Sequence, residues 1–120
     1  MVEYRTGSQS SYLHLPKIGA FITRALGCEE LFQGSLNLYA PVPVTFPDPA
    51  RVRCGAEDWL FVPVVLSERF VGLAARRPPP DSSEFIEVFA CQKLASALGL
   101  KNHDQVTVRL LPGKYLALAA

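Results

Sequence analysis

Two oxygen-bearing side chains in one short segment could hold a metal ion or a phosphate. Ser35 and Asn37 flank Leu36 within residues 34–39 (GSLNLY). Residues two apart on a strand point to the same face, so the hydroxyl and the amide oxygen would lie side by side. Neutral oxygen ligands suit Mg²⁺, which keeps several waters and accepts substrate phosphates. Glycine, serine and asparagine together are also typical of a turn that leads into a strand, and this alternative stays open.

Glu87 is a carboxylate whose position on its expected strand calls for a partner. In residues 82–90 (SSEFIEVFA), strand alternation places Phe85, Glu87 and Phe89 on one face. A carboxylate among aromatic rings is costly to desolvate unless a hydroxyl or a basic group contacts it. We therefore expect a partner for Glu87, and a ligand hydroxyl would serve. The alternative is that Glu84 and Glu87 are solvent-facing charges on an edge strand.

The surrounding sequence predicts a mainly β chain that positions these side chains. Strands are expected within residues 4–15, 34–39, 84–90 and 105–111, with Val106 and Val108 on one buried face of the last. Residues 58–66 and 69–77 read as a hairpin through a two-residue turn at Ser67 and Glu68. Prolines at positions 41, 43, 47 and 49 predict a loop or a ragged edge over residues 41–54.

Two short helices are expected beside the strands. Apolar residues at spacings of three and four from Ile18 to Ala25 predict an amphipathic helix from Lys17 that stops at Gly27. A second helix is expected over residues 93–100, where Leu94 and Leu98 share a face. Because helices and strands do not alternate, a barrel with accessory helices fits better than a doubly wound sheet.

Composition limits the classes of protein that need to be considered. The chain has 120 residues, 49% hydrophobic and 19% charged, which predicts one globular domain over residues 1–120. A net charge of +1 provides no strong field for a polyanion, so nucleic-acid binding is not indicated. No apolar stretch is long enough to span a bilayer, and we expect a cytoplasmic protein without membrane association. Cys28, Cys54 and Cys91 are widely spaced and odd in number, which predicts reduced thiols.

Two further pairs of residues have both a structural and a functional interpretation. Trp59 and Phe61 are expected in the core, with stacking on a flat ligand as the alternative. Arg76 and Arg77 precede three prolines and are expected to be solvated, with contact to a phosphate as the alternative.

Five short segments, in one order, resemble the archaeal-type CTP-dependent riboflavin kinases. That family carries a strand ending in Leu-Pro, a helix ending in Leu-Gly, a Gly-Thr-Leu-Asn motif, a Ser-Ser-Glu-x-Ile-Glu strand and a closing helix, turn and strand. The matching segments are residues 11–16 (SYLHLP), 24–27 (RALG), 34–39 (GSLNLY), 82–90 (SSEFIEVFA) and 93–108 (KLASALGLKNHDQVTV). The resemblance covers most of the chain.

The resemblance implies a six-stranded cradle-loop type barrel that transfers the γ-phosphate of CTP to the 5′-hydroxyl of riboflavin, giving FMN. It implies that Ser35 and Asn37 hold Mg²⁺ and that Glu87 and the position of Pro79 contact the flavin. The implied contact with a flavin hydroxyl makes Glu87 the candidate general base. It also assigns the nucleotide to a first loop and to the segment after the Ser-Ser-Glu strand. The residues implied to bind nucleotide are Gly7, Ser8, Gln9, Ser10, Gln92, Lys93, Leu94 and Ala95.

The chain departs from the family pattern in its first loop. The family usually has Gly-x-Gly-Glu-Gly there, whereas this chain keeps only Gly7 and continues with Ser8, Gln9 and Ser10. Backbone N–H groups cradle phosphates most readily where glycine permits positive φ. Three interpretations therefore stay open: a flavin kinase acting as a monomer or small homo-oligomer, a barrel that binds flavin or nucleotide without transfer, and a swapped-hairpin transcription regulator.

Overall fold

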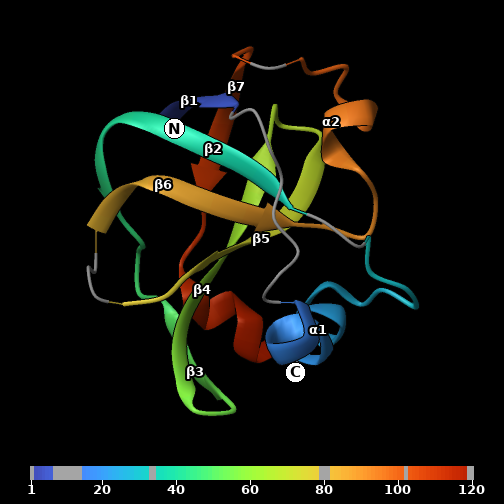
Figure 1. Cartoon of the computed structure of the whole chain (residues 1–120), viewed down its shortest axis with the longest axis vertical. Coiled ribbons are helices and arrows are strands. Elements are labelled where there is room, and N and C mark those ends of the chain that lie inside the picture. Colours follow the sequence, from blue (N-terminus) through green and yellow to red (C-terminus); the bar gives the residue numbers. More distant parts are fainter. Residues whose placement is uncertain (1, 7–14, 33–34, 79–81, 102, 119–120) are drawn as a thin grey trace.

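The computed structural model describes residues 2–6, 15–32, 35–78, 82–101 and 103–118. Within these ranges, seven strands, two α-helices and one 3₁₀ helix follow one another in sequence (Figure 1). They are β1 (Val2–Thr6), α1 (Leu15–Leu26), β2 (Leu36–Thr45), β3 (Ala50–Cys54), β4 (Glu57–Leu66), β5 (Phe70–Arg76), β6 (Ser82–Phe89), α2 (Leu94–Ala97), β7 (Gln105–Leu110) and η1 (Gly113–Leu118). The prediction of a mainly β chain with two short helices is confirmed.

All the strand pairings are antiparallel, and their order explains how distant segments meet. The sheet runs β3-β4-β5-β6-β2-β1-β7, and β7 also pairs with β4. The pairings of β4, β5, β6, β2, β1 and β7 therefore return to their starting strand, with β3 attached outside this ring. In this order β2 and β6, which carry the candidate site residues, are direct neighbours.

Two apolar cores lie on the two faces of the sheet. The first is enclosed by the ring of strands and includes Leu38, Val62 and Ile86. The second lies on the outer face, where Phe61 and Phe89 pack with residues of α1 and η1. Alternation along β4 and β6 sends neighbouring residues to opposite cores, as expected for strands buried on both faces. α1 and η1 lie side by side at one end of the molecule (Figure 1) and cover the outer core.

Helix α1 confirms the predicted amphipathic helix and its stop. Ile18 and Ile22 are fully buried on the face that packs against the sheet. Gly27 has a φ of +70°, a conformation that side chains with a Cβ rarely adopt. The N–H of Gly27 donates to the Arg24 carbonyl at 3.3 Å and that of Cys28 to the Thr23 carbonyl at 3.1 Å, which is a Schellman end. Of the strand expected within residues 4–15, residues 4–6 belong to β1 and Leu15 begins α1, whereas residues 7–14 lie outside the described part.

Of the loop or ragged edge predicted over residues 41–54, the ragged edge is what the structure shows. Strand β2 continues to Thr45, and β3 occupies Ala50–Cys54. The prolines have the effect expected of them, because pairing between β2 and β6 is interrupted between Tyr39 and Val44. Pro41 and Pro43 lie exposed in this unpaired stretch, where no ladder hydrogen bond requires their missing N–H groups.

The β4–β5 hairpin is confirmed, with its turn at the predicted residues. Ser67 and Glu68 both have positive φ, and the Arg69 N–H donates to the Leu66 carbonyl at 3.0 Å. The predicted strands at β6 and β7 are also confirmed, with Val106 and Val108 buried. The second predicted helix is shorter than expected, since α2 spans only Leu94–Ala97. Helix η1 was not predicted.

The prediction of three reduced thiols is wrong. Cys28 and Cys91 form a disulfide across 63 positions of sequence, with Cα atoms 5.7 Å apart. Cys54 is a free, buried thiol. Burial raises the pKa of the Cys54 thiol and the nearby Glu57 carboxylate raises it further, so the group stays protonated and is a poor nucleophile. The disulfide joins the end of α1 to the residues that follow β6, next to the candidate site.

Loss of this disulfide should destabilise the fold markedly. Closing a loop of this length removes chain entropy worth about 4 kcal/mol from the unfolded state, and measured effects are usually about 2–4 kcal/mol. We expect the Cys28→Ser, Cys91→Ser double variant to lower the free energy of unfolding by about that amount in urea titrations. Dithiothreitol should do the same to the wild type and leave the double variant unchanged. Equal urea midpoints for oxidised and reduced wild type would contradict the prediction.

Candidate functional site

Ser35, Asn37 and Glu87 come together through the register of β2 and β6. Ser35 lies just before β2, Asn37 is its second residue, and Asn37 and Glu87 are direct partners across the two strands. Ser35 and Glu87 are 52 positions apart in sequence. Ser35 and Glu87 are therefore in contact because β2 pairs with β6 and Ser35 directly precedes β2.

A single serine hydroxyl links the three side chains. The Ser35 Oγ lies 3.1 Å from Glu87 Oε2 and 3.3 Å from Asn37 Oδ1, in positions to donate a hydrogen bond. The hydroxyl has one proton, so it donates to one of the two oxygens at a time. Ser35 is 5% exposed and Glu87 9% exposed. The predicted proximity of Ser35 and Asn37 is confirmed. The buried Glu87 carboxylate was expected to have a partner, and the Ser35 hydroxyl is one.

The donor set has the chemistry of a hard-cation site. It offers a hydroxyl, an amide oxygen and one carboxylate, the ligand types that Mg²⁺ takes together with water and substrate phosphates. Within the described ranges, no group of three or more His, Cys, Asp or Glu side chains could hold a metal ion. His, Cys, Asp and Glu side chains of the described residues therefore do not form a complete metal site by themselves. Ser35, Asn37 and Glu87 instead fit a site in which phosphate oxygens supply further ligands.

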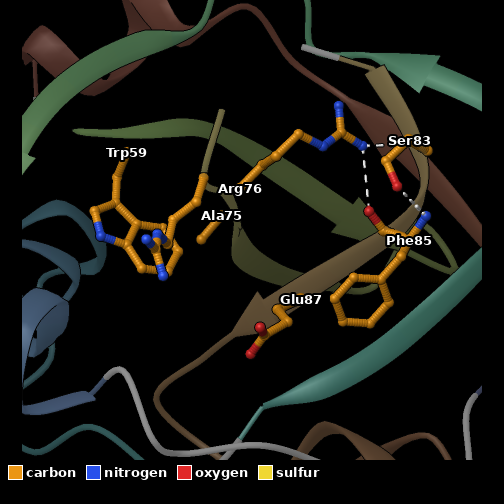
Figure 2. Close-up of a pocket in the computed structure, with 7 residues that line it drawn as sticks. Trp59, Ala75, Arg76, Ser83, Phe85 and Glu87 are labelled. Atoms are coloured by element: carbon orange, nitrogen blue, oxygen red, sulfur yellow. Dashed lines mark hydrogen bonds between the residues drawn. The ribbon is translucent and has the colours of Figure 1, made fainter. Parts of the chain in front are cut away.

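A pocket of about 240 Å³ opens beside Glu87 on the outer face of the sheet (Figure 2). Three neighbouring strands supply its walls. The lining residues are Trp59, Ala75, Arg76, Arg77, Ser83, Phe85 and Glu87. Ala75 is the direct partner of Glu87 across β5 and β6, and its small side chain leaves space between larger neighbours. The Glu87 carboxylate is thereby shared by the oxygen cluster and by a mostly apolar pocket.

Arg76 is not the solvated residue that the sequence suggested. It is 6% exposed, and its guanidinium donates to the carbonyls of Val44 at 2.6 Å, Ser83 at 3.1 Å and Phe85 at 3.3 Å. The guanidinium also lies 4.2 Å from the centre of the Phe46 ring. Figure 2 shows the side chain reaching toward Ser83 and Phe85, away from Trp59. Arg76 therefore binds the backbone of β2 and β6 where their pairing is irregular.

Arg77 occupies a different environment, with half of its side chain exposed. Its Nη1 lies 2.7 Å from Oε2 of Glu57, a carboxylate only 15% exposed, and its guanidinium carbon is 6.0 Å from the Trp59 ring centre. Trp59 and Phe61 are both buried in the outer core, as predicted, but Trp59 also lines the pocket. No local sequence signal indicated the Glu57–Arg77 pair, because Glu57 begins β4 and Arg77 follows the end of β5.

The residues implied to bind nucleotide are only partly described. Gln92 and Lys93 are exposed, Ala95 is half-buried and Leu94 is buried. They come shortly after β6, beside Ala90, whose carbonyl accepts a hydrogen bond from the Phe32 N–H at 3.2 Å, and Cys91, which is disulfide-bonded to Cys28. The implied nucleotide residues Gly7, Ser8, Gln9 and Ser10 and the implied flavin contact Pro79 lie outside the described residues.

Comparisons with known proteins do not name a family for this chain. A scan against models of protein families gives no match, and no curated protein matches the sequence. In the part of the chain that the structure describes, every helix is too short or too polar to cross a bilayer.

Proposed function

We propose that this protein is a Mg²⁺-dependent phosphotransferase that moves the γ-phosphate of CTP to the 5′-hydroxyl of riboflavin, giving FMN. The observation that carries the proposal is the convergence of Ser35, Asn37 and Glu87, with the Ser35 hydroxyl 3.1 and 3.3 Å from the other two side chains. The resemblance to the archaeal-type riboflavin kinases names the substrates. Two segments far apart in sequence supply complementary parts of one site, which supports the proposal.

The proposed roles follow from the chemistry of each side chain. Ser35 and Asn37 would hold Mg²⁺, which when bound offsets the charge of the phosphate oxygens. Glu87 accepts the proton of the riboflavin 5′-hydroxyl as its oxygen forms a bond to the γ-phosphorus and the bond to the β-phosphate oxygen breaks, releasing CDP. Phosphoryl transfer asks mainly for positioning and charge stabilisation, so a small set of fixed residues is sufficient.

The nucleotide would lie over the segment that follows β6. Gln92 and Lys93 are exposed at its start, and Lys93 supplies an ammonium group suited to a phosphate.

The proposal places the protein in the cytoplasm, with the nucleotide substrate. Structural disulfides are rare in most cytoplasmic proteins, so the Cys28–Cys91 bond is unusual for that compartment.

A fluorescence titration followed by a product assay tests the proposal. Riboflavin fluorescence is followed as protein is added, then CTP and Mg²⁺ are supplied and FMN is separated from riboflavin by chromatography. We expect flavin quenching and FMN that requires both CTP and Mg²⁺. Quenching without FMN would indicate the alternative, a flavin-binding barrel without transfer activity. No response to riboflavin or to CTP would contradict both.

A further inference from the structure

The pocket beside Glu87 is lined by both a hydrogen-bond acceptor and a hydrogen-bond donor. Glu87 is an acceptor on β6, and Arg77, immediately after β5, is a donor. Ala75 and Arg77 are two residues apart, so they lie on the same face if the extended backbone continues, with Ala75 directly opposite Glu87. A ligand that places a hydroxyl near Glu87 would therefore extend across Ala75 toward Arg77.

Arg77 is held in position by two neighbours. The Glu57 carboxylate pairs with Nη1 at 2.7 Å, and the guanidinium lies 6.0 Å from the Trp59 ring centre, within the range of a cation–π contact. The guanidinium has five N–H donors in a fixed planar fork, and the ion pair with Glu57 occupies only part of it. Since half of the Arg77 side chain is exposed, the rest of the fork can reach a ligand in the pocket.

We infer that Arg77 is a specificity-determining residue that recognises the carbonyl edge of a planar heteroaromatic ring bound in this pocket beside Phe85. The inference rests on the proposed function for the identity of the ring, which is that of riboflavin. The pocket volume of about 240 Å³ is smaller than that of most complete ligand sites, so it suits a ring system whose side chain continues outward past Glu87.

The chemistry of the two ends fixes the orientation of the ligand. The Glu87 carboxylate accepts hydrogen bonds and repels carbonyl oxygens, whereas the Arg77 guanidinium donates to carbonyl oxygens. The flavin ring has carbonyl oxygens on the edge opposite its dimethylbenzene end, and its ribityl chain carries the hydroxyls. Arg77 at the ring edge and Glu87 at the ribityl chain would give each end of the ligand a matching partner.

Lumiflavin tests this inference separately from phosphoryl transfer, because it has the flavin ring but no ribityl hydroxyl. We expect wild-type protein to quench lumiflavin fluorescence and Arg77→Met to weaken this binding about 10- to 100-fold, the effect of losing a charged hydrogen-bond donor. Arg77→Lys should recover only part of it, because an ammonium lacks the planar fork. Arg53→Met is the matched control, since Arg53 forms an exposed ion pair with Asp58 on the neighbouring hairpin and does not line the pocket.

The outcomes separate this inference from the proposed function. If Arg77→Met binds lumiflavin as tightly as the wild type, or if the wild type makes FMN yet does not bind lumiflavin, the role of Arg77 is refuted while the kinase proposal stands. If lumiflavin binding is lost in Arg77→Met and the wild type makes no FMN, ring recognition by Arg77 is supported and the kinase proposal fails. Thermal unfolding of each variant checks that lost binding does not come from lost folding.

Discussion

Replacing Asn37 by alanine should lower the rate of FMN formation about 100-fold or more. The amide oxygen of Asn37 is one of the two neutral donors proposed to hold Mg²⁺, and a metal ion at a transferring phosphate is worth several kcal/mol of transition-state stabilisation. The fold should tolerate the change, because Asn37 is only half-buried and the bond between Ser35 and Glu87 remains.

Asn37→Asp is the informative companion to Asn37→Ala. It keeps an oxygen at the same position, so it should retain much more activity than the alanine variant while adding a negative charge beside Glu87. Initial rates of FMN formation at saturating CTP and several Mg²⁺ concentrations would show the difference. If Asn37→Ala were as active as the wild type, Asn37 would have no part in the site.

Replacing Glu87 by glutamine should lower turnover about 10²- to 10⁴-fold, the usual range for loss of a general base. Glutamine has nearly the same shape as glutamate, and its amide oxygen can still accept a hydrogen bond from the Ser35 hydroxyl. A neutral amide is also less costly to bury than a carboxylate. We therefore expect the thermal midpoint to stay unchanged or to rise while activity falls.

Glu84→Gln is the matched control for Glu87→Gln. Both glutamates lie on β6, but Glu84 is exposed and does not line the pocket. Its substitution should leave FMN formation and the thermal midpoint near wild-type values. Equal losses of activity in the two variants would point to a general effect of charge on β6 and would count against Glu87 as the base.

The elements predicted best from the sequence are those whose signal is local. Helix α1 has an apolar face at helical spacing and a glycine that permits a left-handed end at Gly27. The β4–β5 turn at Ser67 and Glu68 lies between two runs of β-branched and aromatic residues. In each case the residues that form the element also carry the signal for it, so the expectation was confirmed.

The features that were missed depend on contacts between distant segments. Nothing in the spacing of Cys28 and Cys91 shows that the end of α1 lies beside the residues after β6. The prolines indicated the irregular pairing at Pro41 and Pro43, but they did not show that β2 continues through them to pair again with β6 at Val44 and Thr45. Helix η1 was missed for the same reason, since its packing against the outer core holds it.

The candidate site also has one part that local spacing predicted and one part that depends on contacts between distant segments. The proximity of Ser35 and Asn37 followed from their spacing and is confirmed by the 3.3 Å contact. That Glu87 joins them required the register of β2 against β6, which the alternation of polar and apolar residues does not specify between strands 52 positions apart. Arg77 was expected to be solvated, and its ion pair with Glu57 again depends on tertiary structure.

Transfer of an isotopic label from CTP to riboflavin measures the proposed phosphoryl transfer directly. Wild-type protein would be incubated with riboflavin, Mg²⁺ and CTP labelled in its γ-phosphate, and the label followed by chromatography. We expect label to accumulate in FMN, with one CDP formed for each FMN, and Asn37→Ala to abolish most of this transfer. Label that stays in CTP, or that appears only as inorganic phosphate, would contradict it.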